Sequence, residues 1–374
     1  MIYLDNSATT KIDKRVIEKM TPYLSKYYGN PSSVYKFGQI SRRAIDRSRE
    51  IIANYLNSDL QEIIFTSGGT ESNNLALKGI VNGNNKNKIS HIITSEIEHD
   101  SILNTLKEIK NIEVTYIKPD QTGKIKVEDV DNAIKENTIL ISIIHANSEI
   151  GVIQDIENIG KIAKKNNVLF HVDAMQSLKY LDIDVNKFNI DLLTFGAHKI
   201  NGPKGIGALY IKRGTPIQAL IKGGSQEYRI RGGTENLSAI VGFGEAVELL
   251  KSEKYKRQEY VKTLRDNFER DILKINGTKL NSNASNRMPH LSNILFDKIN
   301  SESMLIQLDL YNISASAGSA CSSLSIEPSH VLTSIGLTEK EAKHSIRFSL
   351  GHENTQIEIE KTIQVIKEIL NKYE

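Results

Sequence analysis

The chain has 374 residues, of which 39% are hydrophobic and 25% are charged, the balance of a globular protein with two to three domains. Its 48 Lys and Arg against 45 Asp and Glu leave a net charge of +3, which argues against nucleic acid or an anionic membrane as the main partner. A single cysteine excludes an internal disulfide framework, and the most apolar stretch, residues 139–146, is far shorter than the ~20 residues that span a bilayer. The N-terminus carries no secretory signal pattern, so we expect a cytoplasmic protein.

Short apolar runs rich in Ile and Val alternate with helical patterns between about residues 50 and 220. Runs of this length predict parallel strands that are buried on both faces. Gly, Asn and Ser gather where the runs end, which is the edge at which an α/β sheet binds its ligands. We expect a doubly wound α/β domain with strands at residues 62–66, 90–94, 113–117, 139–145, 168–172, 191–195 and 207–211.

A long charged helix is predicted at residues 242–274 from apolar residues spaced three and four apart. The remainder is mixed, with strands expected at 292–296 and 345–349 and a terminal helix at 353–373. These patterns predict a large α/β domain at residues 15–255. They also predict a smaller α+β domain made of residues 1–14 and 256–374.

The motif SGGTESNN, residues 67–74, directly follows an apolar strand pattern. Gly69 permits close backbone approach, Thr70 offers a hydroxyl, and a helix N-terminus offers free N–H groups to a phosphate. A glycine turn with an N-cap is the simpler alternative. No GxxxxGK[ST] pattern is present, which argues against a P-loop nucleotide site.

Two polar side chains, Asp173 and Gln176, follow the apolar strand pattern in FHVDAMQS. A carboxylate at a strand's carboxyl end can ligate a metal, bind a ribose or pair with a protonated ring nitrogen. It can equally cap the next helix.

Lys199 follows a buried strand pattern and precedes the glycine-rich segment INGPKGIG. A poorly hydrated lysine has a lowered pKa, and its neutral amine can attack a carbonyl. Most lysines are solvated surface charges. The presence of Asp173 one βα unit earlier favours the interpretation that Lys199 is a nucleophile.

The only cysteine, Cys321, lies in a stretch of small polar residues, SASAGSACSSLS. Such a segment packs poorly into a core, so its thiol is either a nucleophile on an exposed loop or inert. His99, Asn147 and Arg347 also lie at or within strand ends. Arg347 needs an anionic partner, which a substrate carboxylate would supply, although each of the three alone is more often structural.

Ten segments together resemble the NifS/IscS-type cysteine desulfurases, which are PLP enzymes of the class V aminotransferase family. They occur in the family's order: YLDNSATT, YGNPSS, FTSGGTESNN, EIEHDSIL, HANSEIGVIQDI, HVDAMQS, HKINGPKGIGALY, RIRGGTEN, SAGSACSS and SIRFSLG. The resemblance implies the PLP-dependent transferase fold type I. It also implies that PLP is the cofactor, bound covalently by Lys199, with Asp173 keeping the ring nitrogen protonated and His99 stacking on the ring.

The other roles come from the resemblance alone. It implies that the remaining cofactor contacts come from Asn147 and Gln176 at the phenolic oxygen, from Gly69, Thr70, Gly196, Ala197 and His198, and from Thr234 of a second subunit in a homodimer. Arg347 would bind the substrate carboxylate, with Asn147 and Asn30 nearby. No metal ligands are expected, although Cys321 can contact an Fe–S cluster held by an acceptor.

The implied reaction converts L-cysteine to L-alanine and leaves a persulfide on Cys321. Lys199 would remove the α-proton, and His99 would serve as an acid or base. The persulfide sulfur would then pass to an Fe–S scaffold protein or a tRNA-thiolation protein. The alternatives are a selenocysteine lyase or other class V PLP enzyme, and a non-catalytic PLP-binding scaffold protein.

Several positions depart from the family pattern. Gly196 and Gly232 replace serines, Met175 replaces a small residue, and Ser148 replaces an asparagine. Losing a charge-assisted hydrogen bond to the phosphate costs ~1.5–3 kcal/mol. We therefore predict weaker PLP retention than in family members with both serines.

Overall fold

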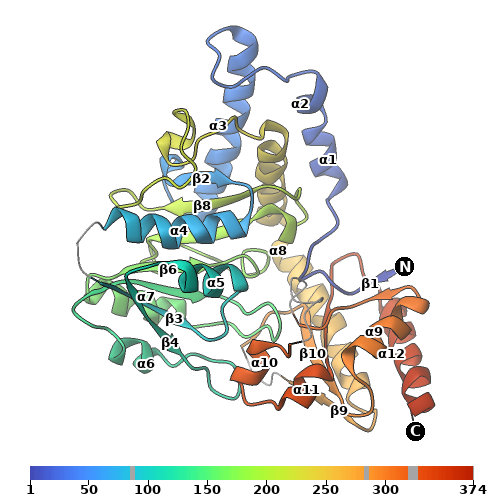
Figure 1. Cartoon of the computed structure of the whole chain (residues 1–374). Helices are drawn as coiled ribbons and strands as arrows, with labels where there is room; N and C mark the ends of the chain where they lie inside the picture. The colour runs from blue at the N-terminus through green and yellow to red at the C-terminus, as the bar shows by residue number, and fades with distance from the viewer. Residues whose placement is uncertain (85–88, 282–285, 319–326, 374) are drawn as a thin grey trace.

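A seven-stranded sheet forms the centre of the larger part of the molecule (Figure 1). This computed structural model describes residues 1–84, 89–281, 286–318 and 327–373. The strand order is β2-β8-β7-β6-β5-β3-β4. In chain order the strands are β2 (Ile63–Thr66), β3 (Ser90–Ser95), β4 (Ile112–Ile117), β5 (Thr138–Ile144), β6 (Leu169–Asp173), β7 (Leu192–Gly196) and β8 (Gly207–Ile211).

Five neighbouring strands, β4, β3, β5, β6 and β7, run parallel, which confirms the mainly parallel doubly wound sheet. The expectation of parallel pairing is wrong for β8, which is antiparallel to both β7 and β2. Only residues 197–206 separate β7 from β8, fewer than the dozen or more that a crossover between parallel strands requires. Burial on both faces is wrong for β4, an edge strand with partly exposed side chains.

Helices cover both faces of this sheet. Apolar side chains of α1, α3, α6, α7 and the first half of α8 form one core with the sheet, whereas those of α4 and α5 form another. The helices are α1 (Lys14–Met20), α2 (Pro22–Ser25), α3 (Lys36–Leu56), α4 (Gly69–Gly83), α5 (Asp100–Glu108), α6 (Val127–Asn132), α7 (Ile156–Lys165) and α8 (Leu237–Ile272). In Figure 1, α1, α2 and the start of α3 form an arm that projects beyond the sheet.

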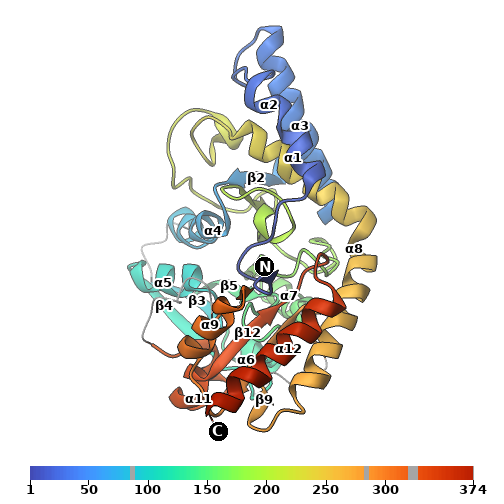
Figure 2. The same ribbon diagram turned by 90° about the vertical axis from the view of Figure 1, so that its right-hand side faces the viewer.

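A smaller antiparallel sheet, β12-β10-β9, packs against the second half of α8 and against α9 and α12 (Figure 2). The N-terminal strand β1 pairs in parallel with β11, so the start of the chain joins this second unit. The elements are β1 (Ile2–Tyr3), β9 (Thr278–Leu280), β10 (Leu291–Phe296), β11 (Ile313–Ser314), β12 (Ser345–Ser349), α9 (Ser301–Leu310), α10 (His330–Ser334), α11 (Glu339–Lys343) and α12 (Gln356–Leu370).

The long helix α8 begins five residues before its predicted start, because Asn236 accepts a hydrogen bond from the Ala239 N–H and caps it. Its first half packs into the core of the large sheet, and Val261, Leu264 and Phe268 pack into the second core. Residue 255, the expected domain boundary, therefore lies within one continuous helix. The predicted division at that residue stays a prediction.

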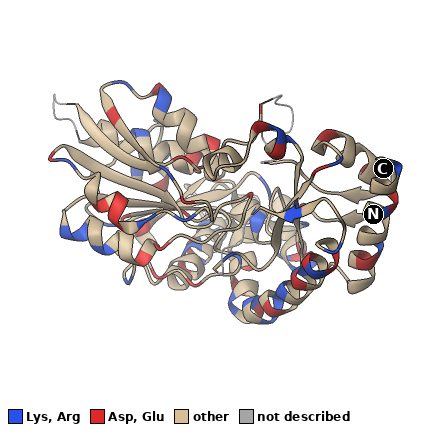
Figure 3. Ribbon diagram, turned by 90° about the horizontal axis from the view of Figure 1, so that it is seen from below, with Lys and Arg blue, Asp and Glu red and all other residues tan. Residues whose placement is uncertain are grey.

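Basic and acidic residues are interspersed along the helices and loops seen from below (Figure 3). Within the described ranges, no helix combines the length and the apolar character needed to cross a bilayer.

Candidate active site

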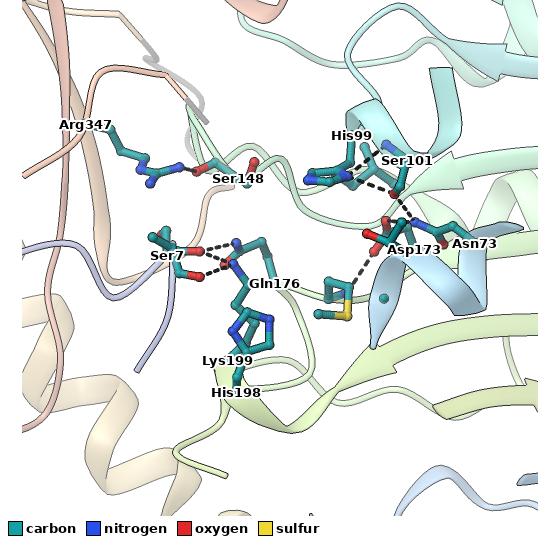
Figure 4. A pocket seen from close by; sticks show the side chains of 15 residues that line it. Ser7, Asn73, His99, Ser101, Ser148, Asp173, Gln176, His198, Lys199 and Arg347 are labelled. Atoms are coloured by element: carbon teal, nitrogen blue, oxygen red, sulfur yellow. Dashed lines mark hydrogen bonds between the residues drawn. The ribbon is translucent and has the colours of Figure 1, made fainter. Parts of the chain in front are cut away.

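A cavity of ≈260 Å³ lies where the parallel strands of the large sheet end (Figure 4). Most of its lining follows strands of that sheet, and we call this part the sheet wall: Gly69, Thr70, Asn73, His99, Ser101, Ile144, Ser148, Asp173, Met175, Gln176, His198 and Lys199. The rest, here called the facing wall, is Ser7, Ala8 and Arg347. The cavity thus lies at the edge where α/β sheets bind their ligands.

The helix α4 supplies the anion-binding part of the sheet wall. It begins at Gly69, and its N-cap residue Gly68 has no side chain with which to accept from the first N–H groups. Uncapped N–H groups and the positive end of the helix dipole favour a negatively charged ligand, and the Thr70 hydroxyl is beside them. This arrangement suits a phosphate.

Asp173 ends β6 and is 3% exposed. Its Oδ1 accepts from the Met175 N–H at 2.9 Å, and its Oδ2 accepts from Asn73 Nδ2 at 2.9 Å. Each carboxylate oxygen can accept a second hydrogen bond, so Asp173 can pair with a protonated ring nitrogen. In the described part of the chain, no group of three or more His, Cys, Asp or Glu residues is arranged to hold a metal ion.

His99 caps the N-terminus of α5 with its ring. The Ser101 N–H donates to His99 Nδ1 at 3.1 Å, and the Ser101 hydroxyl lies 2.8 Å from the same nitrogen. Asn73 Nδ2 donates to the Ser101 hydroxyl at 2.8 Å, which leaves that hydroxyl's proton for His99. Because Nδ1 is an acceptor, the neutral ring carries its proton on Nε2.

Lys199 lies in a short helical turn, Ala197–Lys199, directly after β7. Its Nζ donates to the backbone carbonyls of Ser7 and of Ala8, the latter at 2.8 Å. The amine therefore reaches across the cavity to the facing wall (Figure 4). Next to it, burial and the charges of Lys199 and Lys204 lower the pKa of His198 to about 4, so His198 is neutral at pH 7.

The segment around Ser7 is held from several sides. Gln176 Nε2 donates to the Ser7 carbonyl at 2.8 Å, and the Ser7 N–H donates to Ser349 Oγ at 2.8 Å. The Ser7 hydroxyl lies 3.1 Å from His290 Nε2. These contacts join the N-terminal segment to both sheets and fix the carbonyls that Lys199 meets.

Arg347 lies in β12 and is 1% exposed. The partner expected for this cation exists within the chain, because Nη2 donates to Asp5 Oδ1 at 2.8 Å and Nη1 to the Ser148 carbonyl at 3.1 Å. Nε is buried and has no partner among the described residues. The guanidinium lines the cavity, where it can meet a carboxylate.

The predicted cofactor and substrate residues do not all reach this cavity. Asn147 is buried, and its amide bonds to backbone groups of Ile97, Glu149 and Ile150. Its side chain therefore holds a turn beside the cavity. Asn30, on the projecting arm, accepts from the Ser32 N–H.

Three other predicted positions lie apart from the lining. Gly196 and Ala197 lie behind it, with Ala197 fully buried. Thr234 lines a separate cavity of ≈180 Å³ with Ser67 and Arg231. Cys321 lies outside the described residues.

Four residues that line the cavity were not singled out from the sequence. They are Asn73, Ser101, Ser7 and Ala8. Two of these carried a local signal. Asn73 comes one helical turn after Thr70, and Ser101 comes two residues after His99, at an N-cap spacing. The N-terminal residues had none, because only tertiary packing brings them to the cavity.

Comparison with known proteins adds an independent line of evidence. The family model described as "Aminotransferase class-V" matches residues 2–362. A relative named cysteine desulfurase IscS, from Methanosarcina thermophila, is 46% identical over 99% of this chain and 92% of its own. A solved "NIFS-LIKE PROTEIN" is 35% identical with a TM-score of 0.93, covering 99% of both chains. Another, described as "SspA in complex with cysteine", is 40% identical with a TM-score of 0.85, over 95% of this chain and 100% of that one.

Proposed function

The chain belongs to the class-V aminotransferase family and is a PLP-dependent cysteine desulfurase similar to NifS and IscS, and we propose that the cavity described above is its active site. One observation supports this assignment above the others. A lysine amine (Lys199), a carboxylate (Asp173), a histidine (His99) and an uncapped helix N-terminus line the same cavity.

The residues present fit PLP. The α4 N-terminus and Thr70 suit the phosphate, Asp173 suits the pyridinium nitrogen, and Lys199 suits covalent attachment. When bound, PLP supplies an electron sink for the α-carbon of the substrate. The buried Asn73 Oδ1, which has no partner among the described residues, leaves an acceptor for a water or ligand beside Asp173.

In the proposed reaction Lys199 takes the α-proton of L-cysteine, and the Cys321 thiolate attacks the substrate sulfur. The Cβ–S bond breaks and an S–S bond forms, so sulfur is oxidised and Cβ is reduced. The bond pair stays with Cβ, which takes up a proton to become a methyl group, and Lys199 returns a proton to the α-carbon to give L-alanine. The Nε2–H tautomer of His99 makes it a hydrogen-bond donor to substrate or cofactor at this stage.

Arg347 is proposed to bind the substrate carboxylate from the facing wall. Its two Nη groups are shared with Asp5 and Ser148, so the substrate has to approach a guanidinium that is already oriented. A preoriented planar cation favours two parallel hydrogen bonds to a carboxylate. The role proposed for Asn147 is to hold the turn that carries Ser148.

We propose a homodimer in which Thr234 of each subunit completes the other's cofactor site. Two observations support it. Thr234 lies in its own cavity, and the projecting arm carries large exposed apolar side chains at Leu24, Tyr28, Val34 and Tyr35. Exposed apolar groups on such an arm favour association with a second copy.

The persulfide is proposed to pass to an acceptor protein for Fe–S cluster assembly or tRNA thiolation, in a reducing cytoplasm. The interspersed charges of Figure 3 support a protein acceptor over direct nucleic-acid binding.

The decisive experiment is alanine release from L-cysteine in the presence of a thiol reductant, with Cys321→Ala as the comparison. Alanine from the native protein and little from the variant would support the persulfide route. Equal rates would contradict the role of Cys321. No alanine from either, with PLP bound, would shift the search to L-selenocysteine and other amino acids.

A further inference from the structure

Met175 covers two glycines, Gly69 in the sheet wall and Gly196 directly behind it. A Cβ built on Gly69 would lie 2.8 Å from Met175 Sδ, and a Cβ built on Gly196 would lie 2.8 Å from Met175 Cε and 3.1 Å from Sδ. The thioether therefore occupies the space into which side chains at both positions would project. Three positions that are far apart in the sequence form one packing unit.

The backbone does not explain why these residues are glycines. Gly196 is extended, with φ −153° and ψ 155°, a conformation open to every residue. Gly69 is the first residue of α4 and has no positive φ. The restriction at both positions is steric, and it comes from Met175.

Met175 is also tied to the chemistry of the cavity. Its N–H donates to Asp173 Oδ1 at 2.9 Å, and its side chain lines the cavity beside the N-terminus of α4. One residue thus contacts the proposed ring partner and the proposed phosphate site. A methionine side chain has three rotatable bonds, so a new neighbour would displace it instead of unfolding the sheet.

We propose that Met175 determines the shape of the phosphate end of the site and so how tightly the chain retains PLP. This inference rests on the proposed site. A side chain at position 196 would push the thioether into the cavity, where it competes with the cofactor. Glycine at 196 is therefore required only while methionine stands at 175.

The test is a double-mutant cycle in the full-length protein, with Gly196→Ser, Met175→Ala and the two together. Two quantities are measured: the Kd of PLP for the cofactor-free protein, from the visible absorbance of bound PLP, and the thermal midpoint of the cofactor-free protein. We expect Gly196→Ser to raise the Kd about tenfold with little change in the midpoint, because the displaced thioether moves into the cavity and does not strain the surrounding core. The double variant should bind PLP at least as tightly as the native protein, because the serine hydroxyl then has room.

A matched control exists outside the cavity. A Cβ on Gly242 would lie 2.5 Å from Met20 Sδ, so Met20→Ala and Gly242→Ser repeat the same steric relation between α1 and α8. These variants should change the midpoint without changing the Kd.

Native PLP binding in Gly196→Ser, or a loss that Met175→Ala does not relieve, would overturn the inference. Failure of the native protein to bind PLP would contradict the proposed site itself.

Discussion

The sheet wall contains local hydrogen bonds, whereas the facing wall is held by contacts between the two ends of the chain. Asp173 and Met175, or His99 and Ser101, are two residues apart, although Asp173 also bonds to Asn73, 100 residues earlier. Arg347 and Asp5, or Ser349 and Ser7, are 342 residues apart. The sheet wall therefore follows from where strands end, whereas the facing wall exists only once both ends of the chain have met.

This difference between the two walls predicts that the rate of the reaction depends most on residues of the sheet wall. Replacing Lys199 by Ala removes the amine that binds PLP and moves the α-proton. We expect alanine release to fall about a thousandfold, within the range for a positioned proton-transfer group. Lys204→Ala, at an exposed lysine five residues later, is the control and should remain active. A comparable loss of alanine release in Lys199→Ala and Lys204→Ala would mean that Lys199 has no specific role in the reaction.

Substrate binding should depend on the facing wall. Arg347→Lys keeps the charge but loses the planar pair of donors. We expect the KM for L-cysteine to rise about 30-fold, equivalent to the ~2 kcal/mol of a charged hydrogen bond, with a smaller change in kcat. Arg287→Lys is the matched control, because Arg287 pairs with Glu269 outside the cavity. A fall in kcat at unchanged KM would assign Arg347 to chemistry instead.

The same difference explains what could be predicted from the sequence. Lys199 and Asp173 were found because each follows an apolar run that becomes a buried strand. The contact between Lys199 and the Ser7 carbonyl could not be found, since it requires the pairing of β1 with β11. Asn147 illustrates a further limit. The local sequence pattern is the same for an asparagine whose amide is buried against backbone groups and for an asparagine whose amide faces a ligand.

The fold shows the same limit. Apolar runs predicted all seven strands of the large sheet, including β4 with its partly exposed side chains, because a run rich in Ile and Val is visible in the local sequence. The predicted direction of β8 is wrong although the short connection before it, residues 197–206, is visible in the sequence, because an apolar run by itself carries no direction. The start of α8 was missed by five residues because the capping role of Asn236 is visible only from its contact with Ala239.

The large sheet behind the sheet wall should also determine how stability depends on pH. His171, in β6, lies between Ser142 and Thr194 hydroxyls at 2.8 and 3.0 Å. Burial lowers its pKa from 6.5 to about 4. Between these values the unfolded chain binds more protons, so stability is lost as pH falls below about 6.5.

For His171 alone the loss between pH 7 and pH 5 is about 2 kcal/mol. The free energy of unfolding should therefore fall more steeply over this interval in the native protein than in His171→Asn. The difference between the two slopes, from denaturant titrations at both pH values, is the quantity to measure. Equal slopes would show that His171 is not held neutral.

The smallest expected effect on the free energy of unfolding comes from the hydrogen bonds that hold the facing wall in place. The Tyr3 hydroxyl lies 3.0 Å from the Asp5 carbonyl and 2.9 Å from the Thr9 carbonyl, closing the turn that presents Ser7 and Ala8 to the cavity. Burial raises the pKa of Tyr3 to about 12, so the hydroxyl remains a donor at neutral pH.

Tyr3→Phe should lower the free energy of unfolding by about 1 kcal/mol, the net value of one hydrogen bond. The control is Tyr116→Phe, at a side chain that is 39% exposed on the edge strand β4, where we expect a change within about 0.5 kcal/mol. If the turn were held mainly by the large sheet through Gln176, Tyr3→Phe would match this control. A loss confined to Tyr3→Phe would mean that the N-terminal segment stabilises itself before Lys199 meets it, and that the facing wall is a preformed surface.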